Sequence, residues 1–361
     1  MDSSRYLLDS HKLMYHPDRV AEWLATGDTR PITMEVSPTS VCNHRCRFCS
    51  FQYMDHPSIR IGREVGYGLI ADARRIGIKA ILYSGEGEPL LNKHVPSFIE
   101  LTSRMQIDSA LVTNGVLLTP SVFEAVGKYL TWMRFSVDAA TSHTHSIVHG
   151  TSESDYDTII SNVFDALTIR KLNGWKCTIG AQFVIVPDNY TEIAAFADLL
   201  KDSSIDYISY KPYYKHHMND TPYDNIDIDM SIIDRLIDEA RGTCKNNSIE
   251  IIHRTGTMAD NNSSSAVSGC RRCYAMPFFI HVDAHGDVYW CNRFVGDTGY
   301  SMGNVNDTGL YDIWYSDRRR AMVERYKDGY MCYEPSVSCR NDKMNSYLES
   351  IISGTEHINF V

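Results

Sequence analysis

The 361-residue sequence lacks the features of several protein classes. It has no apolar run long enough to cross a bilayer, and Met1 to Tyr6 lack the charged-then-apolar pattern that begins a signal peptide. It also lacks an excess of positive charge: its net charge is −10, whereas nucleic-acid-binding proteins usually carry a basic stripe. We therefore predict a cytoplasmic protein that binds neither membranes nor nucleic acid.

The ten cysteines are unevenly distributed along the chain. Most fall into two clusters, at 42–49 and 270–339. In a reducing compartment, clustered cysteines indicate metal ligands rather than disulfides. Cys177 and Cys244 lie outside both clusters, and we expect them to be free, buried thiols.

The first cluster lacks a fourth cysteine. Cys42, Cys46 and Cys49 directly follow a strand-like run at 32–36. A structural zinc site is closed by four protein ligands, whereas an iron–sulfur cluster held by three cysteines keeps one iron open for an exogenous ligand. The spacing therefore favours a reactive cluster, with a zinc knuckle or ordinary thiols as the alternative.

This Cys-x3-Cys-x2-Cys motif, with Phe48 at the aromatic position, resembles that of the radical S-adenosylmethionine (SAM) enzymes. The resemblance implies a [4Fe-4S] cluster that binds SAM through its open iron and cleaves it reductively. The product is a 5′-deoxyadenosyl radical that abstracts hydrogen from a substrate. It also implies a reducing partner such as flavodoxin or ferredoxin.

The chain downstream alternates short β-branched runs with amphipathic stretches, which is typical of βα units. Strands are predicted at 32–37, 79–84, 109–113, 132–138, 177–186 and 205–211. Helices are predicted at 17–25, 62–76, 94–106, 120–129, 154–173 and 190–201. The fold class is α/β, and the family resemblance implies a partial (β/α)6 TIM-like barrel of parallel strands. We predict a helical extension (1–31), the barrel (32–254), a Ser/Asn-rich linker (255–269) and a small cysteine-rich hairpin and helix domain (270–361).

Polar residues follow several predicted strands, where barrel enzymes place functional groups. Tyr83 to Pro89 is similar to the family element that holds the amino group of SAM, although alone it is an ordinary polar turn. The resemblance extends to Thr113 to Gly115 and to the fourth strand. The predicted SAM-binding residues are Phe48, Gly85, Gly87, Glu88, Asn114, Ser136 and Asp138. A hydrogen-bond network inside the barrel is the alternative role for the polar groups of the fourth strand.

The predicted sixth strand runs into a basic and aromatic group that includes Lys211, Lys215 and His216. This group is suited to an acidic or sugar-like substrate, and a solvated loop is the alternative. His143, His145 and His149 follow the fourth strand, and we expect exposed or capping histidines there, because cysteines already account for metal binding.

The second cysteine cluster surrounds a β-hairpin pattern, in which alternating residues flank a turn containing Gly286. Gly286-x4-Cys291 resembles the SPASM or twitch extensions, which carry auxiliary iron–sulfur clusters. The resemblance implies one auxiliary [4Fe-4S] cluster with ligands Cys273, Cys291, Cys332 and Cys339. Cys270 is a substitute ligand or a free thiol that donates hydrogen. A zinc ribbon is the alternative for this region.

Only 31 residues precede the first predicted strand, which is too few for the peptide-binding domain of many peptide-modifying relatives, since domains rarely fall below about 40 residues. We therefore predict a small polar metabolite, sugar-like, as the substrate, oxidised or epimerised with Lys211 and Cys270 as catalytic residues. The alternatives are a peptide- or protein-modifying maturase, and a non-catalytic iron–sulfur or zinc-binding protein.

Overall fold

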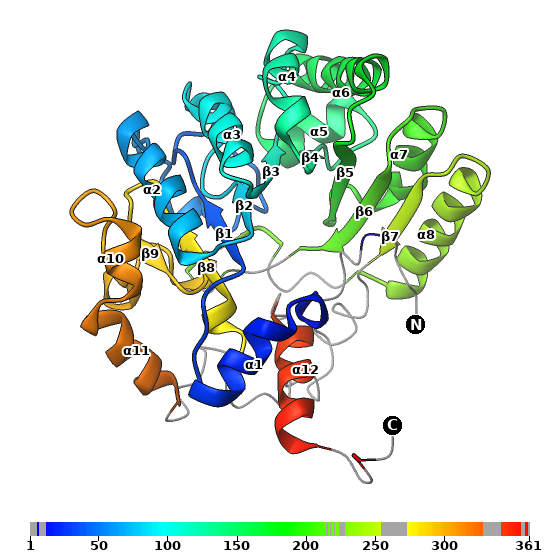
Figure 1. Cartoon of the computed structure of the whole chain (residues 1–361). Helices are drawn as coiled ribbons and strands as arrows, with labels where there is room; N and C mark the ends of the chain where they lie inside the picture. The colour runs from blue at the N-terminus through cyan, green and yellow to red at the C-terminus, as the bar shows by residue number, and fades with distance from the viewer. Residues whose placement is uncertain are drawn as a thin grey trace.

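The computed structural model describes residues 6, 12–213, 216, 218–219, 221–223, 228–253, 273–327, 341–354 and 358–359. Its centre is a nine-stranded sheet, in the order β7-β6-β5-β4-β3-β2-β1-β8-β9. The strands are β1 (Thr33–Val36), β2 (Ala80–Tyr83), β3 (Asp108–Thr113), β4 (Trp132–Ser136), β5 (Thr178–Ile185), β6 (Tyr207–Pro212), β7 (Glu250–His253), β8 (Phe279–Val282) and β9 (Val288–Tyr289). All neighbours pair in parallel except β8 and β9, so the sheet is an open, curved partial barrel (Figure 1).

Helices cover the outer face of this curved sheet (Figure 1). They are α2 (Arg63–Ile76), α3 (Val95–Arg104), α4 (Pro120–Val126), α5 (Ser142–His149), α6 (Glu153–Asn173), α7 (Ile193–Leu200) and α8 (Met230–Cys244). In α2, the buried residues Leu69, Ile70, Ala73 and Ile76 recur every three or four positions, which gives the helix one apolar face toward the sheet. All six predicted strands and all six predicted helices, α1 (Pro17–Thr26) included, are confirmed within a few residues.

The hairpin near the C-terminus extends the same sheet. β8 pairs in parallel with β1, and Ile280 lies opposite Met34. The cluster loop after β1 and the hairpin turn after β8 therefore leave the same edge of the sheet. The predicted linker 255–269 lies outside the described residues, and the domain boundary there stays a prediction.

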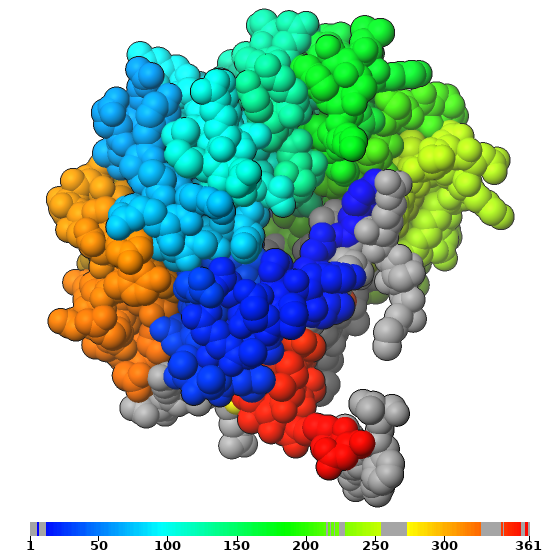
Figure 2. Space-filling model, in the orientation of Figure 1, coloured from blue at the N-terminus to red at the C-terminus, as the bar shows by residue number. Residues whose placement is uncertain are grey.

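The helices at the two ends of the chain lie against each other. Trp23 in α1 (Pro17–Thr26) shares an apolar cluster with Phe278 and with Leu348 of α12 (Asp342–Ser353). Figure 2 shows α1 in blue directly against α12 in red. The remaining described α-helices are α10 (Leu310–Trp314) and α11 (Asp317–Lys327). No helix among the described residues is long and apolar enough to span a membrane.

A partly buried ion pair joins the N-terminal segment to α11. The Arg319 guanidinium donates two hydrogen bonds to the Asp28 carboxylate, one of 2.6 Å, and lies 3.8 Å from the ring centre of Trp314. We expect Asp28→Ala to lower the free energy of unfolding by about 2–3 kcal/mol. This is less than the cost of about 3–5 kcal/mol for a fully buried pair, because Asp28 is partly exposed. Denaturant unfolding measures this cost.

Asp317→Ala is the matched control, because Asp317 pairs with Arg320 on the same helix and both side chains are exposed. Its expected cost is about 0–1 kcal/mol. Equal effects of the two substitutions would contradict a structural role for the partly buried pair.

Candidate active site

Three cysteine thiols gather on the loop that follows β1. Burial raises the pKa of Cys42 to about 11 and also raises the pKa of Cys46 and Cys49. The charge of Cys49 raises the pKa of the other two thiols further, so the three sulfur atoms lie within electrostatic range of one another. Bound iron would offset the cost of ionising these thiols, since a coordinating thiol is deprotonated by its metal.

Two other segments hold this loop in place. The backbone N–H groups of Arg45 and Arg47 donate to the carbonyls of His149 and Val148 at the end of α5, each at 2.9 Å. On the other side, the Asn219 amide donates to the Cys49 carbonyl, and its oxygen accepts from the Tyr53 N–H at 2.8 Å. Asn219 is almost fully buried. It therefore connects the last cysteine to a segment 170 residues away.

We expect Asn219→Ala to weaken cluster retention. The substitution removes both hydrogen bonds that fix the turn after Cys49, and loss of such supporting contacts typically costs about 10–100-fold in metal affinity. Iron release during timed exposure to a chelator measures the effect. Asn247→Ala is the control, because the Asn247 side chain also bonds a distant carbonyl, that of Lys201, but outside the cysteine loop that follows β1. Equal iron release from both variants would contradict the assigned role.

The glycines after β2 let that segment pack directly against the chain entering the cluster loop. A side chain at Gly87 would meet the Thr39 and Val41 carbonyl oxygens at 2.6 and 2.3 Å. Gly85 has a φ of +113°, and a side chain there would overlap Ser37. Both positions therefore need glycine, because the loop after β2 packs directly against the residues that precede the cysteines.

Glu88 connects the ends of β2 and β3. Its buried carboxylate accepts hydrogen bonds from the Thr113 hydroxyl at 2.7 Å and from the Asn114 N–H at 2.8 Å. Burial raises its pKa, and these hydrogen bonds act in the opposite direction. The Asn114 amide in turn donates to the Asn43 side chain in the cluster loop at 2.7 Å. Glu88 and Asn114 thus lie beside the cysteines, and their contact with SAM stays a prediction.

Ser136 is the last residue of β4, whereas Asp138 lies two residues beyond it with a φ of +57°, so the strand predicted to reach residue 138 ends before Asp138. Ser136 is half-buried opposite Gln182. Asp138 is fully buried: its Oδ1 accepts from the Val184 N–H, and its Oδ2 lies 3.2 Å from His149 Nε2. The Asp138 carboxylate therefore faces protein groups on both sides.

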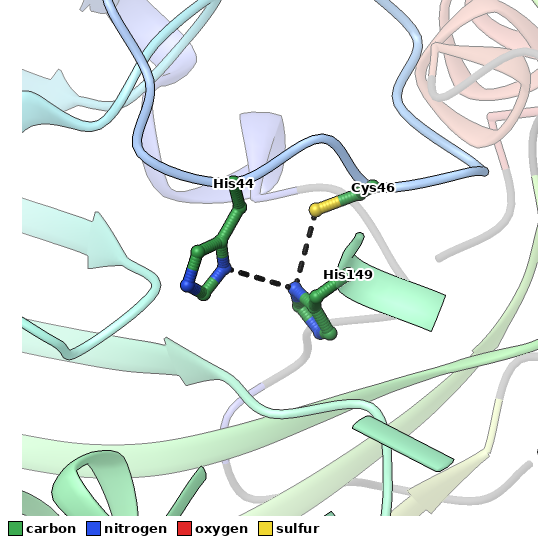
Figure 3. A group of neighbouring side chains, drawn as sticks. All are labelled: His44, Cys46 and His149. Atoms are coloured by element: carbon green, nitrogen blue, oxygen red, sulfur yellow. Dashed lines mark hydrogen bonds between the residues drawn. The ribbon is translucent and has the colours of Figure 1, made fainter. Parts of the chain in front are cut away.

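The expectation of exposed or capping histidines is wrong for His145 and His149. His143 is exposed, but the other two are buried and stack with ring centres 4.3 Å apart. His149 Nδ1 lies 3.2 Å from Cys46 Sγ and 3.3 Å from Nδ1 of the buried His44 (Figure 3). The buried face of α5 thus carries histidines that contact the cluster loop.

Phe48 and the residues after β6 border the site. Phe48 packs beside Val148, Val184 and Tyr223. Lys211 is half-buried at the carboxyl end of β6, as predicted. His216 is buried and stacks on Tyr53 with ring centres 4.8 Å apart, so it supports the cluster loop. Lys215 lies outside the described residues.

Two of the predicted auxiliary ligands are described. Cys273 is partly buried, and the Asn345 amide of α12 donates to its sulfur at 3.8 Å. Cys291 packs against the apolar cluster of Phe51, Tyr289, Phe294 and Val295, which Cys49 also borders. The other cysteines of this region lie outside the described residues: Cys270, Cys332 and Cys339.

Sequence reasoning missed a pair of buried carboxyl groups at this edge, Glu86 and Asp283. Glu86 follows β2 and Asp283 directly follows β8, and the Ala284 N–H donates to Glu86 at 3.4 Å. Burial and the charge of Glu86 raise the pKa of Asp283 to about 7. The only signal in the sequence is the glutamate two positions before Glu88, because the pairing of β8 with β1 brings Asp283 there.

Two parts of the chain match known families. Residues 36–200 match the radical SAM superfamily, and residues 270–340 match SPASM, an iron–sulfur cluster-binding domain. Together they span more than half of the chain. The chain belongs to the radical SAM superfamily. This radical SAM enzyme therefore uses a [4Fe-4S] cluster and SAM, and it has a C-terminal iron–sulfur domain.

The enzyme is similar to the cofactor-modifying protein of the tungsten-containing aldehyde ferredoxin oxidoreductase from Pyrococcus furiosus. The two are 24% identical over 295 residues, covering 78% of this chain and 80% of the relative. It is 23% identical to GTP 3′,8-cyclase from Aquifex aeolicus, over 83% of this chain and 98% of that one. Its fold is similar to that of Streptococcus suis SuiB bound to SAM, with a TM-score of 0.60 at 19% identity, covering 84% and 70% of the two chains.

Proposed function

We propose that this enzyme abstracts a hydrogen atom from a small polar metabolite and oxidises or epimerises it at a carbon that bears a hydroxyl group. The observation that supports this most is the convergence of Cys42, Cys46 and Cys49 with Glu88 and Asn114 at the carboxyl edge of the sheet. In parallel α/β folds that edge is where ligands bind.

The residues present suit the cofactors of the family. Three partly buried thiols with raised pKa values provide three sulfur ligands, which match a cluster with one open iron. When bound, the cluster and SAM supply the 5′-deoxyadenosyl radical. The chain's own groups hold these partners: the cysteines bind iron, and Glu88, Asn114 and Ser136 offer polar groups to SAM. His216 and Asn219 contact the loop from the other side.

The substrate proposal rests on Lys211 and on the relatives. Lys211 places a cation at the carboxyl end of β6, the same edge as the cysteines. GTP 3′,8-cyclase is named for a small anionic substrate, and the Pyrococcus furiosus protein is named for modifying a cofactor. Both similarities support a small-molecule substrate. Electrons are proposed to come from a flavodoxin or ferredoxin.

We also propose one auxiliary [4Fe-4S] cluster, held by Cys273, Cys291, Cys332 and Cys339. Support comes from α12: its first turn contacts Cys273 through Asn345, and Cys339 precedes this helix by only three residues. A substrate radical must lose an electron or regain a hydrogen atom, and the cluster would take the electron. Cys270 is proposed as a further ligand or as the hydrogen donor.

The test is to incubate the reduced enzyme with SAM and candidate metabolites and to quantify 5′-deoxyadenosine and product. We expect Lys211→Ala to raise the KM for an anionic substrate about ten- to a hundredfold, the effect of losing one charge-assisted hydrogen bond of about 1.5–3 kcal/mol. SAM cleavage without substrate should be unchanged. Turnover of a ribosomally made peptide in place of metabolites, or a normal KM in Lys211→Ala, would contradict the proposal.

A further inference from the structure

The atoms His44 Nδ1, Cys46 Sγ and His149 Nδ1 converge on one point behind the cluster loop (Figure 3). All three lie within 4.8 Å of one another. The histidines are about 1% exposed. Imidazole nitrogen and thiolate sulfur together are ligands that Zn²⁺ and other divalent transition metals prefer.

Two of the three distances between these atoms are close to those around a single tetrahedral ion. Around Zn²⁺, with bonds of about 2.0–2.1 Å to nitrogen and about 2.3 Å to sulfur, two nitrogens lie about 3.4 Å apart and nitrogen and sulfur about 3.6 Å apart. The two Nδ1 atoms are 3.3 Å apart, and His149 Nδ1 is 3.2 Å from Cys46 Sγ. The third pair, His44 Nδ1 and Cys46 Sγ, lies within 4.8 Å, so these two atoms would approach each other by up to about 1.2 Å when the ion binds.

The groups behind the two histidines support the same conclusion. Metal-binding histidines usually donate their second ring N–H to a carboxylate or a backbone carbonyl, which directs the free lone pair toward the metal. His149 Nε2 lies 3.1 Å from the Val137 carbonyl and 3.2 Å from Asp138. His44 Nε2 lies 3.3 Å from Asp155. Nε2 of His149 thus has a backbone acceptor and Nε2 of His44 lies near a carboxylate, while their Nδ1 atoms face each other and that of His149 faces Cys46.

We propose that in the cluster-free enzyme His44, Cys46 and His149 bind one divalent transition-metal ion, Zn²⁺ or Fe²⁺, and that this ion and the SAM-binding cluster exclude each other. The ion forms one bond to sulfur and two to nitrogen, the thiol proton passes to solvent, and water completes the tetrahedron. The exclusion rests on the proposed role of Cys46 as a cluster ligand, because the same sulfur serves both.

Co²⁺ titration of the anaerobic, cluster-free enzyme tests the site, because Co²⁺ reports tetrahedral geometry and thiolate ligation in its absorption spectrum. We expect one Co²⁺ with a thiolate charge-transfer band that Zn²⁺ removes by competition. His149→Ala and His44→Ala should each lower the Co²⁺ affinity of this site at least tenfold. His143→Ala, on the exposed face of α5, is the control.

Two further measurements distinguish this site from one formed by Cys42, Cys46 and Cys49. In the double variant C42A/C49A the band should persist, since neither residue is a ligand. In the cluster-free wild-type enzyme, Zn²⁺ should protect Cys46 from alkylation but should not protect Cys42 or Cys49. Cobalt binding that is unaffected by His149→Ala, or equal protection of all three cysteines, would overturn the proposal. Neither result would affect the assignment of SAM cleavage, which is measured on the cluster-loaded enzyme.

Discussion

Replacing Cys46 with alanine is expected to abolish 5′-deoxyadenosine formation. Three cysteines on the loop after β1 leave no spare ligand, so the SAM-binding cluster is lost as a whole. The iron content should fall from about eight to about four per chain, because the auxiliary cluster remains. Product analysis by mass spectrometry and iron analysis of the anaerobic enzyme measure both effects. The same outcome is expected for Cys42→Ala and Cys49→Ala.

Cys177→Ala is the matched control for this prediction. Its thiol is also buried and free, but it lies before β5, outside both clusters. It should retain wild-type iron content and SAM cleavage, with at most a small loss of stability. Continued 5′-deoxyadenosine formation by Cys46→Ala would contradict the assignment of the SAM-binding cluster.

Glu88→Ala is expected to lower SAM affinity about ten- to a hundredfold, which corresponds to the loss of one charge-assisted hydrogen bond. Burial raises the pKa of Glu88, so an ammonium group beside it would stabilise the ionised carboxylate. The substitution also leaves the Thr113 hydroxyl and the Asn114 N–H without their acceptor, and about 1–3 kcal/mol of stability should be lost. Calorimetric titration with SAM measures the affinity.

Glu124→Ala, at an exposed position of α4, is the control for this experiment. Glu88→Gln separates charge from packing, because it keeps the shape and removes the charge. We expect its SAM affinity to fall while its stability falls less than that of Glu88→Ala. Unchanged SAM affinity in Glu88→Ala, with unchanged iron content, would show that the carboxylate only stabilises the loop after β3.

The barrel could be predicted because its strands are local patterns. Runs such as 177–186 are continuous and apolar, and each is followed by an amphipathic stretch, so period and length identify the elements. β7 was missed because it has only four residues, Glu250–His253, with polar residues at both ends. Pairing of β8 with β1 was not predicted, because residues about 246 positions apart in sequence give no local signal of their contact.

The cysteine loop could be predicted in more detail than its surroundings. The ligand spacing lies within eight residues and is read directly from the sequence. The residues that hold the loop in place come from distant segments: Asn219 lies beyond β6, and His149 lies at the end of α5. His145 and His149 are four positions apart, which places them on one helix face, but only the packing of α5 shows that this face is buried.

The same limit applies to the auxiliary region. The Gly286-x4-Cys291 hairpin was confirmed as β8 and β9, and the match to SPASM favours iron–sulfur over a zinc ribbon. Its four predicted ligands remain a proposal, because sequence spacing alone does not show which cysteines share a cluster.

The central claim is that the cluster on Cys42, Cys46 and Cys49 keeps one iron open for SAM. Its most direct test is electron–nuclear double resonance of the reduced, reconstituted enzyme with SAM labelled with ¹⁵N in its amino group. Our account predicts an altered cluster signal with a ¹⁵N coupling that disappears in Cys46→Ala. A cluster signal unchanged by saturating SAM, with no ¹⁵N coupling, would contradict it.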